Sequence, residues 1–405
     1  TRITQTMQTF AQKLDPTRRF TVAISGGWGG GSSKSIDVMG FNYYTHGSTD
    51  KYHKQFPNKP SVATEDASTF STRGIYVEDR NHQHLTAYDT NKPEWGLLAE
   101  ESWQYYAARP YVAGQFQWTG FDYRGEPTPF GWPAISTQFG ILDTCGFPKD
   151  NFYYYQAWWS DHPVLHIFPH WNWPGKEGQD IDVWAFSNCG EVELFLNGVS
   201  QGRKKMPKNS HLEWKVKYAP GVLLARGYTG GKEILSEKIE TTGKPVAIQL
   251  TQLFPDASWT ARASEARPRF STDTKAPSPL RPAGAVQSLK ANGEDVAIIT
   301  VSVADTQGRQ VPDAANKIHF ELAGPGKILG VGNGDPSSHE PDVFLSSGTN
   351  PPDWQRSLFN GLAQVIVQST KEPGDIKLTA RADGLTPVTL TIPSQPTTPR
   401  PAVAD

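Results

Sequence analysis

Residues 36–65 read IDVMGFNYYTHGSTDKYHKQFPNKPSVATE, and their pattern predicts the architecture of the first part of the chain. Two short apolar runs, IDVMGFNYY (36–44) and PSVATE (60–65), flank a longer and more polar segment. Buried strands that alternate with partly helical segments are typical of parallel βα units. Two further apolar runs, FTVAIS (20–25) and YVAGQFQW (111–118), extend the pattern on both sides. We therefore predict a sheet of four parallel strands.

Two segments beside these strands have helical periodicity. Residues 4–14 repeat apolar side chains at the spacing of one helix face, and an Asp-Pro pair follows them. Residues 93–107 predict an amphipathic helix with Trp95, Leu98 and Trp103 on its buried side. Both helices fit the βα pattern of the strands.

After about residue 160 the chain changes to short strands in which apolar and polar residues alternate, separated by turn signals such as Asn-Gly. Alternation of this kind is typical of antiparallel β-sandwiches. We predict a multidomain protein, with domains at 1–160, 161–243 and 244–395 and a tail at 396–405. The last domain contains a Pro-rich insertion at about 254–286, which we interpret as a long loop or linker.

The overall composition and charge argue against some classes of binding partner. A formal net charge of −2 and a pI near 6.5 argue against a nucleic-acid-binding or anionic-membrane-binding surface. No apolar run is long enough to span a membrane, and the first twenty residues lack a signal-peptide pattern. The two cysteines, Cys145 and Cys189, predict buried free thiols and no disulfide. We expect no cofactor and no metal.

Three histidines recur every four residues, at His162, His166 and His170. On a strand they would span about 27 Å at roughly 3.3 Å per residue, which is too far for one metal ion. We predict structural roles for them.

Aromatic residues are concentrated between Tyr111 and Trp159, where 15 of 49 positions are Phe, Trp or Tyr, against 31 in the rest of the chain. Asp122 and Glu126 lie inside this run. Aromatic faces beside carboxylates suit a ligand with apolar C–H faces and many hydroxyls, which is a sugar. The sequence therefore predicts a carbohydrate site in this region.

Polar and aromatic residues also stand at successive strand ends. Asn42 and Tyr44 end one predicted strand, Glu65 ends the next, and Trp118 ends the last. Because the carboxyl ends of parallel strands meet at one rim of a barrel, we expect these four side chains to lie close together.

These residues carry a family resemblance. The segment KPSVATEDASTFSTRGIY (59–76) resembles the nucleophile segment of glycoside hydrolase family 2. DVMGFNYY (37–44) and the run that begins AGQFQWTGFDYRGEP (113–127) resemble the next conserved strand ends of its β-galactosidase branch. The resemblance continues through PHWNWPG (169–175) and VELFLNG (192–198) into the C-terminal part.

The resemblance implies strands five to eight of a (β/α)8 TIM barrel, followed by two immunoglobulin-like β-sandwich domains. It implies a retaining glycosidase in which Glu65 is the nucleophile. Tyr44 would hydrogen-bond Glu65, and Asn42 would lie beside it. Trp118 would form the floor under the sugar ring.

The resemblance also gives roles to the carboxylates after Trp118. Asp122 would accept hydrogen bonds from sugar hydroxyls, and Glu126 would do the same. Ser68 stands where some members of the family carry a histidine. Asp66 is expected to position other groups and not to act as a catalyst.

One feature of the family is absent from the sequence. Its acid/base glutamate follows an asparagine at the end of strand four, and no Asn-Glu pair occurs in this chain. A DPTR segment (15–18) resembles the family's lead-in to strand five. We therefore expect an N-terminal portion of the same enzyme to act as a partner that supplies the acid/base residue.

The expected substrate is a terminal β-galactoside. β-Glucuronidase and β-mannosidase are the alternatives within the family, and a non-catalytic sugar-binding or scaffold fragment is the alternative outside it. The glucuronidase branch usually carries an Asn-x-Lys tripeptide, which is not found between Trp118 and Asp150. A homo-oligomer is possible, and the family suggests a periplasmic or secreted protein.

Overall fold

A computed structural model describes residues 1–253, 286–346 and 352–398. The chain divides into two compact units. The first comprises residues 1–169, 176–239 and 336–338, and the second comprises 170–175, 240–335 and 339–405. All but one residue of the predicted insertion (254–286), and most of the predicted tail (396–405), lie outside the described residues.

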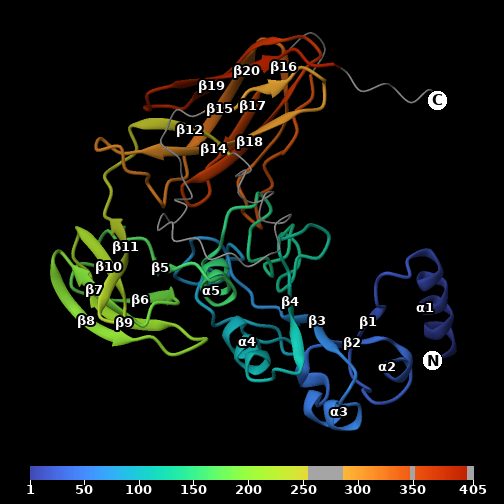
Figure 1. The fold of residues 1–405 in the computed structure, drawn as a ribbon. Helices are drawn as coiled ribbons and strands as arrows, with labels where there is room; N and C mark the ends of the chain where they lie inside the picture. Colours follow the sequence, from blue (N-terminus) through green and yellow to red (C-terminus); the bar gives the residue numbers. More distant parts are fainter. Residues whose placement is uncertain (254–285, 347–351, 399–405) are drawn as a thin grey trace. The chain divides into compact units, whose positions relative to one another are not determined.

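The first unit contains the four-stranded parallel sheet that the sequence predicts (Figure 1). Its strands are β1 (Thr21–Ile24), β2 (Val38–Asn42), β3 (Ser61–Ala67) and β4 (Val112–Trp118). They pair in the order β1-β2-β3-β4, each with its neighbour in the chain. This arrangement is the sheet expected for half of a barrel.

A β-bulge interrupts the regular pairing of β3. Phe41 of β2 pairs with Ala63, but the next residue, Asn42, pairs with Glu65, so Thr64 is an extra residue on β3. A bulge of this kind re-aims the side chains that follow it. Ala63 before it and Asp66 after it are fully buried, whereas Glu65 is only half-buried. The bulge therefore turns Glu65 away from the buried face of the sheet.

Helices cover one face of the sheet. Helix α3 (Thr49–Gln55) and helix α4 (Ala99–Ala107) contribute Tyr52 and Tyr106 to a core shared with β2 and β3. The prediction of a helix from residue 93 is wrong for its first six residues, because residues 93–98 contain a turn closed by a hydrogen bond from the Gly96 N–H to the Pro93 carbonyl. Trp95 is 43% exposed as a result.

The helix predicted at residues 4–14 is confirmed as α1 (Arg2–Leu14). Its apolar face, however, is exposed to solvent. Four apolar side chains on that face are 57% to 72% exposed: Ile3, Met7, Phe10 and Leu14. The opposite, polar face makes the contacts, since Gln8 and Gln12 both donate to the Asp37 carboxylate at 2.9 Å. Figure 1 shows α1 at the β1 end of the sheet. None of the residues of α1 is buried.

The first unit also contains two antiparallel sheets, in the orders β5-β6-β9 and β11-β10-β7-β8. Apolar residues alternate into the interior, as with Val192 and Leu194 of β7. The strands are β5 (Leu165–Phe168), β6 (Asp180–Ser187), β7 (Glu191–Leu196), β8 (Val199–Lys205), β9 (Leu212–Lys217), β10 (Val222–Thr229) and β11 (Lys232–Glu240).

The second unit also has two sheets, in the orders β12-β14-β18-β16 and β13-β20-β19-β15-β17. One hydrophobic core contains buried residues of both sheets, such as Ile299 and Val365 from one and Ile376 and Leu378 from the other. Its strands are β12 (Ala247–Leu253), β13 (Leu289–Lys290), β14 (Val296–Ala304), β15 (Lys317–Ala323), β16 (Gly326–Gly332), β17 (Trp354–Ser357), β18 (Leu362–Ser369), β19 (Gly374–Arg381) and β20 (Val388–Gln395).

Both cysteines are free, as predicted. Cys189 is buried, but Cys145 is partly exposed and so does not fit the expectation of a buried thiol. None of the described helices is long and apolar enough to cross a membrane.

His166 is a residue of strand β5 and contacts helix α5 (Asp150–Trp159) and strand β11. Its Nε2 atom lies 2.8 Å from Asp150, and its Nδ1 atom lies 3.5 Å from Glu237 of β11. The ring also stacks on Tyr153 at a centroid distance of 3.7 Å. Burial alone would lower the pKa of His166, but the two carboxylates outweigh it and raise the pKa to about 9. The structural role predicted for this histidine fits these contacts.

We predict that the first unit loses stability as the pH rises from about 6.5 to about 9. A histidine whose pKa is raised on folding stabilises the folded state while it is charged, and this contribution disappears above the folded pKa. The loss should be on the order of 3 kcal/mol, from a shift of about two to three pKa units. Urea unfolding at pH 6 and pH 9 measures it. In His166→Gln the difference between the two pH values should shrink, and an unchanged difference would contradict the prediction.

Candidate active site

Glu65 lies at the carboxyl end of β3, where parallel-sheet proteins place functional groups. It is half-buried, and the phenol of Tyr43 lies beside its carboxylate. Burial raises the pKa of Tyr43 well above its usual value, and a hydrogen bond with Glu65 raises it further. The neutral phenol is therefore a stable hydrogen-bond donor to this carboxylate.

The partner predicted for Glu65, Tyr44, lies elsewhere. Its ring stacks on Tyr105 of α4 with centroids 3.6 Å apart and planes at 3°. Strand alternation would have placed residues 42 and 44 on one side. The chain leaves β2 at Asn42, however, and Tyr43 has a φ of 54°, which exchanges the directions of the two tyrosines. The prediction for Tyr44 is thus wrong, and Tyr43 takes the place beside Glu65.

Three residues next to Glu65 in space or sequence have positive φ angles: Tyr43 at 54°, and Ala67 and Ser68 both at 72°. Such conformations of non-glycine residues cost about 1–3 kcal/mol each and cluster at functional sites. The Ser68 hydroxyl, which is fully buried, lies 2.7 Å from the Tyr43 hydroxyl. Ser68 therefore fixes the position of the phenol that contacts Glu65.

Asp66 has the structural role that the sequence suggested. It is fully buried and accepts hydrogen bonds from the Tyr44 and Ala67 N–H groups and from the hydroxyls of Ser102 and Tyr106. Burial raises its pKa, and these four donors oppose the rise. With its oxygens occupied, Asp66 anchors the end of β3 to α4.

Asn42 pairs with Glu65 in the register of β2 and β3, as the prediction of adjacent strand ends requires. Its Oδ1 atom accepts a hydrogen bond of 2.7 Å from the Thr64 hydroxyl. Asn42 and the bulge residue Thr64 thus hold each other on the face to which Glu65 is turned.

Trp118 ends β4 and pairs with Ala67 of β3, so it flanks Glu65 on the side opposite β2. Its ring meets Tyr123 edge-on, with centroids 5.9 Å apart. The Tyr123 hydroxyl donates to Glu126 at 2.6 Å, and Glu126 itself is exposed. Trp118 and Glu126 are therefore connected through Tyr123, which the sequence analysis did not single out.

Asp122 has different surroundings from those predicted. Its carboxylate, 6% exposed, forms an ion pair of 2.7 Å with the buried Lys149 and accepts the Gly140 N–H at 2.8 Å. Burial raises the pKa of Asp122 to about 6, although Lys149 opposes the rise. The predicted role as a sugar-hydroxyl acceptor conflicts with these contacts, because both carboxylate oxygens already have partners within the protein.

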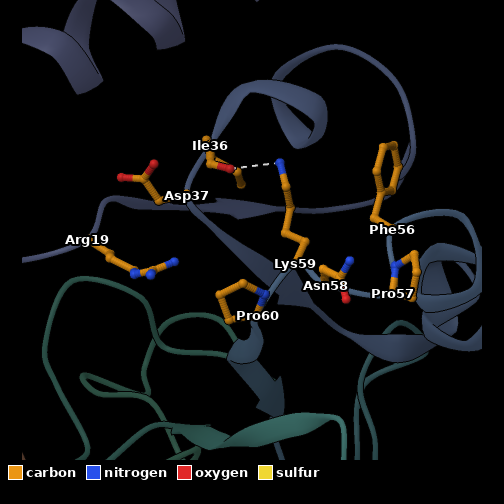
Figure 2. A pocket seen from close by; sticks show the side chains of 8 residues that line it. All are labelled: Arg19, Ile36, Asp37, Phe56, Pro57, Asn58, Lys59 and Pro60. Carbon is orange, nitrogen blue, oxygen red and sulfur yellow. Dashed lines mark hydrogen bonds between the residues drawn. The ribbon is translucent and has the colours of Figure 1, made fainter.

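A pocket of about 460 Å³ lies at the other end of the sheet (Figure 2). Its lining residues Arg19, Asp37 and Pro60 precede β1, β2 and β3, whereas Glu65 is near the end of β3. Within it, the Lys59 ammonium donates to the Ile36 carbonyl at 2.8 Å (Figure 2). This pocket is therefore separate from the predicted site.

Among the residues that the structure describes, no group of three or more His, Cys, Asp or Glu side chains could hold a metal ion. The arrangement at the strand ends thus consists of a half-buried carboxylate, a phenol held beside it, an amide on the neighbouring strand and an indole on the other side. Groups of this kind suit polar, hydroxyl-rich ligands.

Comparisons with known proteins show which proteins the chain is similar to. Residues 284–391 match the model of glycoside hydrolase family 2 C-terminal domain 5, and residues 178–235 match a domain of unknown function. The β-galactosidase BoGH2A from Bacteroides ovatus is 36% identical over 97% of this chain and 44% of its own length. A β-glucuronidase from Formosa agariphila is 24% identical over 86% of this chain and 32% of its own length.

A crystal structure of a β-glycosidase from Bacteroides vulgatus is also similar, with a TM-score of 0.77, 29% identity and coverage of 97% of this chain and 49% of that one. The fold and these matches define the C-terminal portion of a multidomain protein. The chain belongs to glycoside hydrolase family 2. It spans less than half the length of these relatives.

We predict that Asp122→Ala lowers the free energy of unfolding by about 3–5 kcal/mol, because it leaves Lys149 buried without its partner. Replacing both residues, as Asp122→Leu with Lys149→Met, should recover most of the loss, since an apolar pair needs no charge compensation. Urea unfolding of the two variants measures both effects. A loss below about 1 kcal/mol in Asp122→Ala, combined with weaker sugar binding, would restore Asp122 to the binding site.

Proposed function

We propose that this chain forms the nucleophile half of a retaining glycosidase that removes terminal β-galactosyl residues. The observation that carries the proposal is the β-bulge that turns Glu65 out of the buried face at the carboxyl end of β3. Its neighbour Asp66 accepts four hydrogen bonds, two on each carboxylate oxygen, from groups within the protein. Glu65 is therefore the carboxylate of this segment that is available for chemistry.

In the proposed reaction the Glu65 carboxylate attacks the anomeric carbon, and the bond from that carbon to the leaving oxygen breaks. A carboxylic acid on the opposite side of the ring donates its proton to the leaving oxygen. The same group, now a carboxylate, takes a proton from water, which attacks the anomeric carbon and releases Glu65. Tyr43 keeps Glu65 oriented through its hydrogen bond.

The sugar would lie against Trp118, with Asn42 and Glu126 as partners for its hydroxyls. The Tyr123 and Thr128 hydroxyls donate to the two oxygens of Glu126, but this carboxylate is exposed and can accept further hydrogen bonds from a ligand, unlike the buried Asp122. Asn42 retains its amide nitrogen for a ligand because the Thr64 hydroxyl contacts its oxygen. Asp122 is left out of this set because it is paired with Lys149.

The choice of galactose over glucuronic acid rests on two observations. The β-galactosidase BoGH2A is 36% identical, against 29% for a putative β-glucuronidase and 24% for a β-glucuronidase, both from Formosa agariphila. The chain also lacks an Asn-x-Lys tripeptide between Trp118 and Asp150, which the resemblance associates with glucuronidases. Assays with nitrophenyl β-galactoside, β-glucuronide and β-mannoside compare the three sugars directly.

The second carboxylic acid would come from polypeptide that completes the barrel. The relatives are more than twice as long as the part that this chain matches. Within the described residues, β1 and β4 pair on one side only, and unpaired strand edges are a hazard that closed barrels avoid. The exposed apolar face of α1, with Phe10 and Leu14, is a second surface that additional polypeptide would cover.

We predict that Glu65→Gln lowers kcat by a factor of at least about a thousand in the complete enzyme, because the amide cannot form the covalent intermediate. Binding of galactose should persist within about fivefold, since the shape of the side chain is kept. Glu177→Gln, at an exposed glutamate in the turn before β6, is the matched control and should leave kcat unchanged. Unchanged turnover in Glu65→Gln would exclude the nucleophile role. Sugar binding without turnover in the unaltered enzyme would favour a non-catalytic binding protein.

We predict that the double substitution Phe10→Glu, Leu14→Glu prevents assembly with the polypeptide that supplies the other strands. Charges on the apolar face of α1 would have to be buried at the interface, which is costly. Co-elution of the two polypeptides in size-exclusion chromatography is the measurement. Val199→Glu, on a side chain 66% exposed on β8, is the control and should assemble normally. A single active species of 44.7 kDa, found by intact mass, would contradict the need for a partner.

A further inference from the structure

Trp95 is an indole that neither the predicted site nor the proposed mechanism uses. Its ring meets Tyr43 edge-on, with centroids 5.1 Å apart and planes at 83°. Tyr43 in turn contacts Glu65. Trp95 is therefore one aromatic ring away from the proposed nucleophile, and it is 43% exposed.

The turn that carries Trp95 is tied to the strand that carries Glu65. The Leu97 N–H donates to the Ala67 carbonyl at 2.7 Å, and the Gly96 N–H donates to the Pro93 carbonyl at 3.1 Å. A Cβ atom on Gly96 would lie 2.8 Å from the Ala67 carbonyl oxygen and 2.7 Å from the Pro93 ring. Only glycine fits there, so the turn packs directly on the end of β3 and holds the indole in one place.

Trp95 and Trp118 approach the nucleophile from different sides. Trp118 ends β4, the strand on one side of β3, whereas Trp95 packs on Tyr43, which follows β2 on the other side. Phe139 contacts Trp95 at a centroid distance of 6.0 Å, and it belongs to the cluster against which Trp118 packs. The two indoles are therefore connected through Phe139 and the cluster to which it belongs.

We propose that Trp95 is a second sugar platform, which binds the leaving-group side of the substrate. This inference rests on the proposed glycosidase function and adds a substrate class to it. One indole face covers one pyranose ring, and Trp118 is already assigned to the ring that is cleaved off. A second indole beyond Tyr43 fits a leaving group that is itself a pyranose. The preferred substrates are thus galactosyl disaccharides or longer saccharides, and small alkyl galactosides gain nothing from Trp95.

The test compares lactose with methyl β-galactoside in the complete enzyme. Trp95→Ala should lower kcat/KM for lactose about tenfold, mainly through KM, which corresponds to about 1.4 kcal/mol of lost binding. The value for methyl β-galactoside should stay within about twofold. Trp95→Phe should restore most of the lactose activity, because a phenyl ring still offers a flat face. Trp159→Ala, at an equally exposed tryptophan on the last turn of α5, is the control and should affect neither substrate.

An equal loss on both substrates in Trp95→Ala would overturn the inference, since it would mean that Trp95 only supports Tyr43. No loss on either substrate would also overturn it. Both outcomes leave the proposed function intact, because methyl β-galactoside still reports on Glu65. Failure of the proposed function has a different signature, which is full turnover in Glu65→Gln.

Discussion

The proposed chemistry depends on one irregularity in the sheet, the extra residue Thr64 in β3. Without it, Glu65 would follow the strict alternation of the strand and point to the same face as Ala63, which packs against helices α3 and α4. With it, Glu65 leaves that side while Asp66 remains there, fully buried and bonded to Tyr106 and Ser102 of α4. Two adjacent carboxylates thus acquire opposite roles from a single insertion in the register.

The bulge is held by groups on both neighbouring strands and by the helix layer. Asn42 contacts Thr64 from β2, and Asp66 fastens the end of β3 to α4. Ser68, just past the strand, fixes the hydroxyl of Tyr43. The positive φ angles of Tyr43, Ala67 and Ser68 oppose this arrangement locally, and buried hydrogen bonds compensate for them. These hydrogen bonds hold the side chains around Glu65 in position without a substrate, and groups that are already positioned lower the entropy cost of binding.

The sequence predicted the parts of this structure that depend on local pattern. All four parallel strands appear in the expected places, because alternating apolar runs and polar segments report directly on burial. Which tyrosine faces Glu65 could not be predicted, because it depends on the φ angle of Tyr43 and not on residue type. The role of Asp122 was also out of reach, because its partner Lys149 lies 27 positions later. Trp95 was assigned to a helix because the periodicity continues through Pro93–Leu98, yet the close approach of Gly96 to Ala67 requires a turn.

The four-stranded sheet β1-β2-β3-β4 accounts for two features of the first unit: the ordered contacts around Glu65, and the exposed strand edges and apolar face of α1. A retaining mechanism needs two carboxyl groups about 5–5.5 Å apart on opposite sides of one sugar ring. A single four-stranded sheet offers only one side of such a ring, and here that side carries Glu65. The opposite side has to come from strands that continue the sheet beyond its edges, and those strands would need helices to cover them. Helix α1 is bound to Asp37 by its polar residues Gln8 and Gln12, and its apolar face is left exposed, as the proposal of further covering polypeptide requires. Under the proposed function, the open edges, the exposed apolar face of α1 and the lone carboxylate Glu65 all follow from one division of a closed barrel.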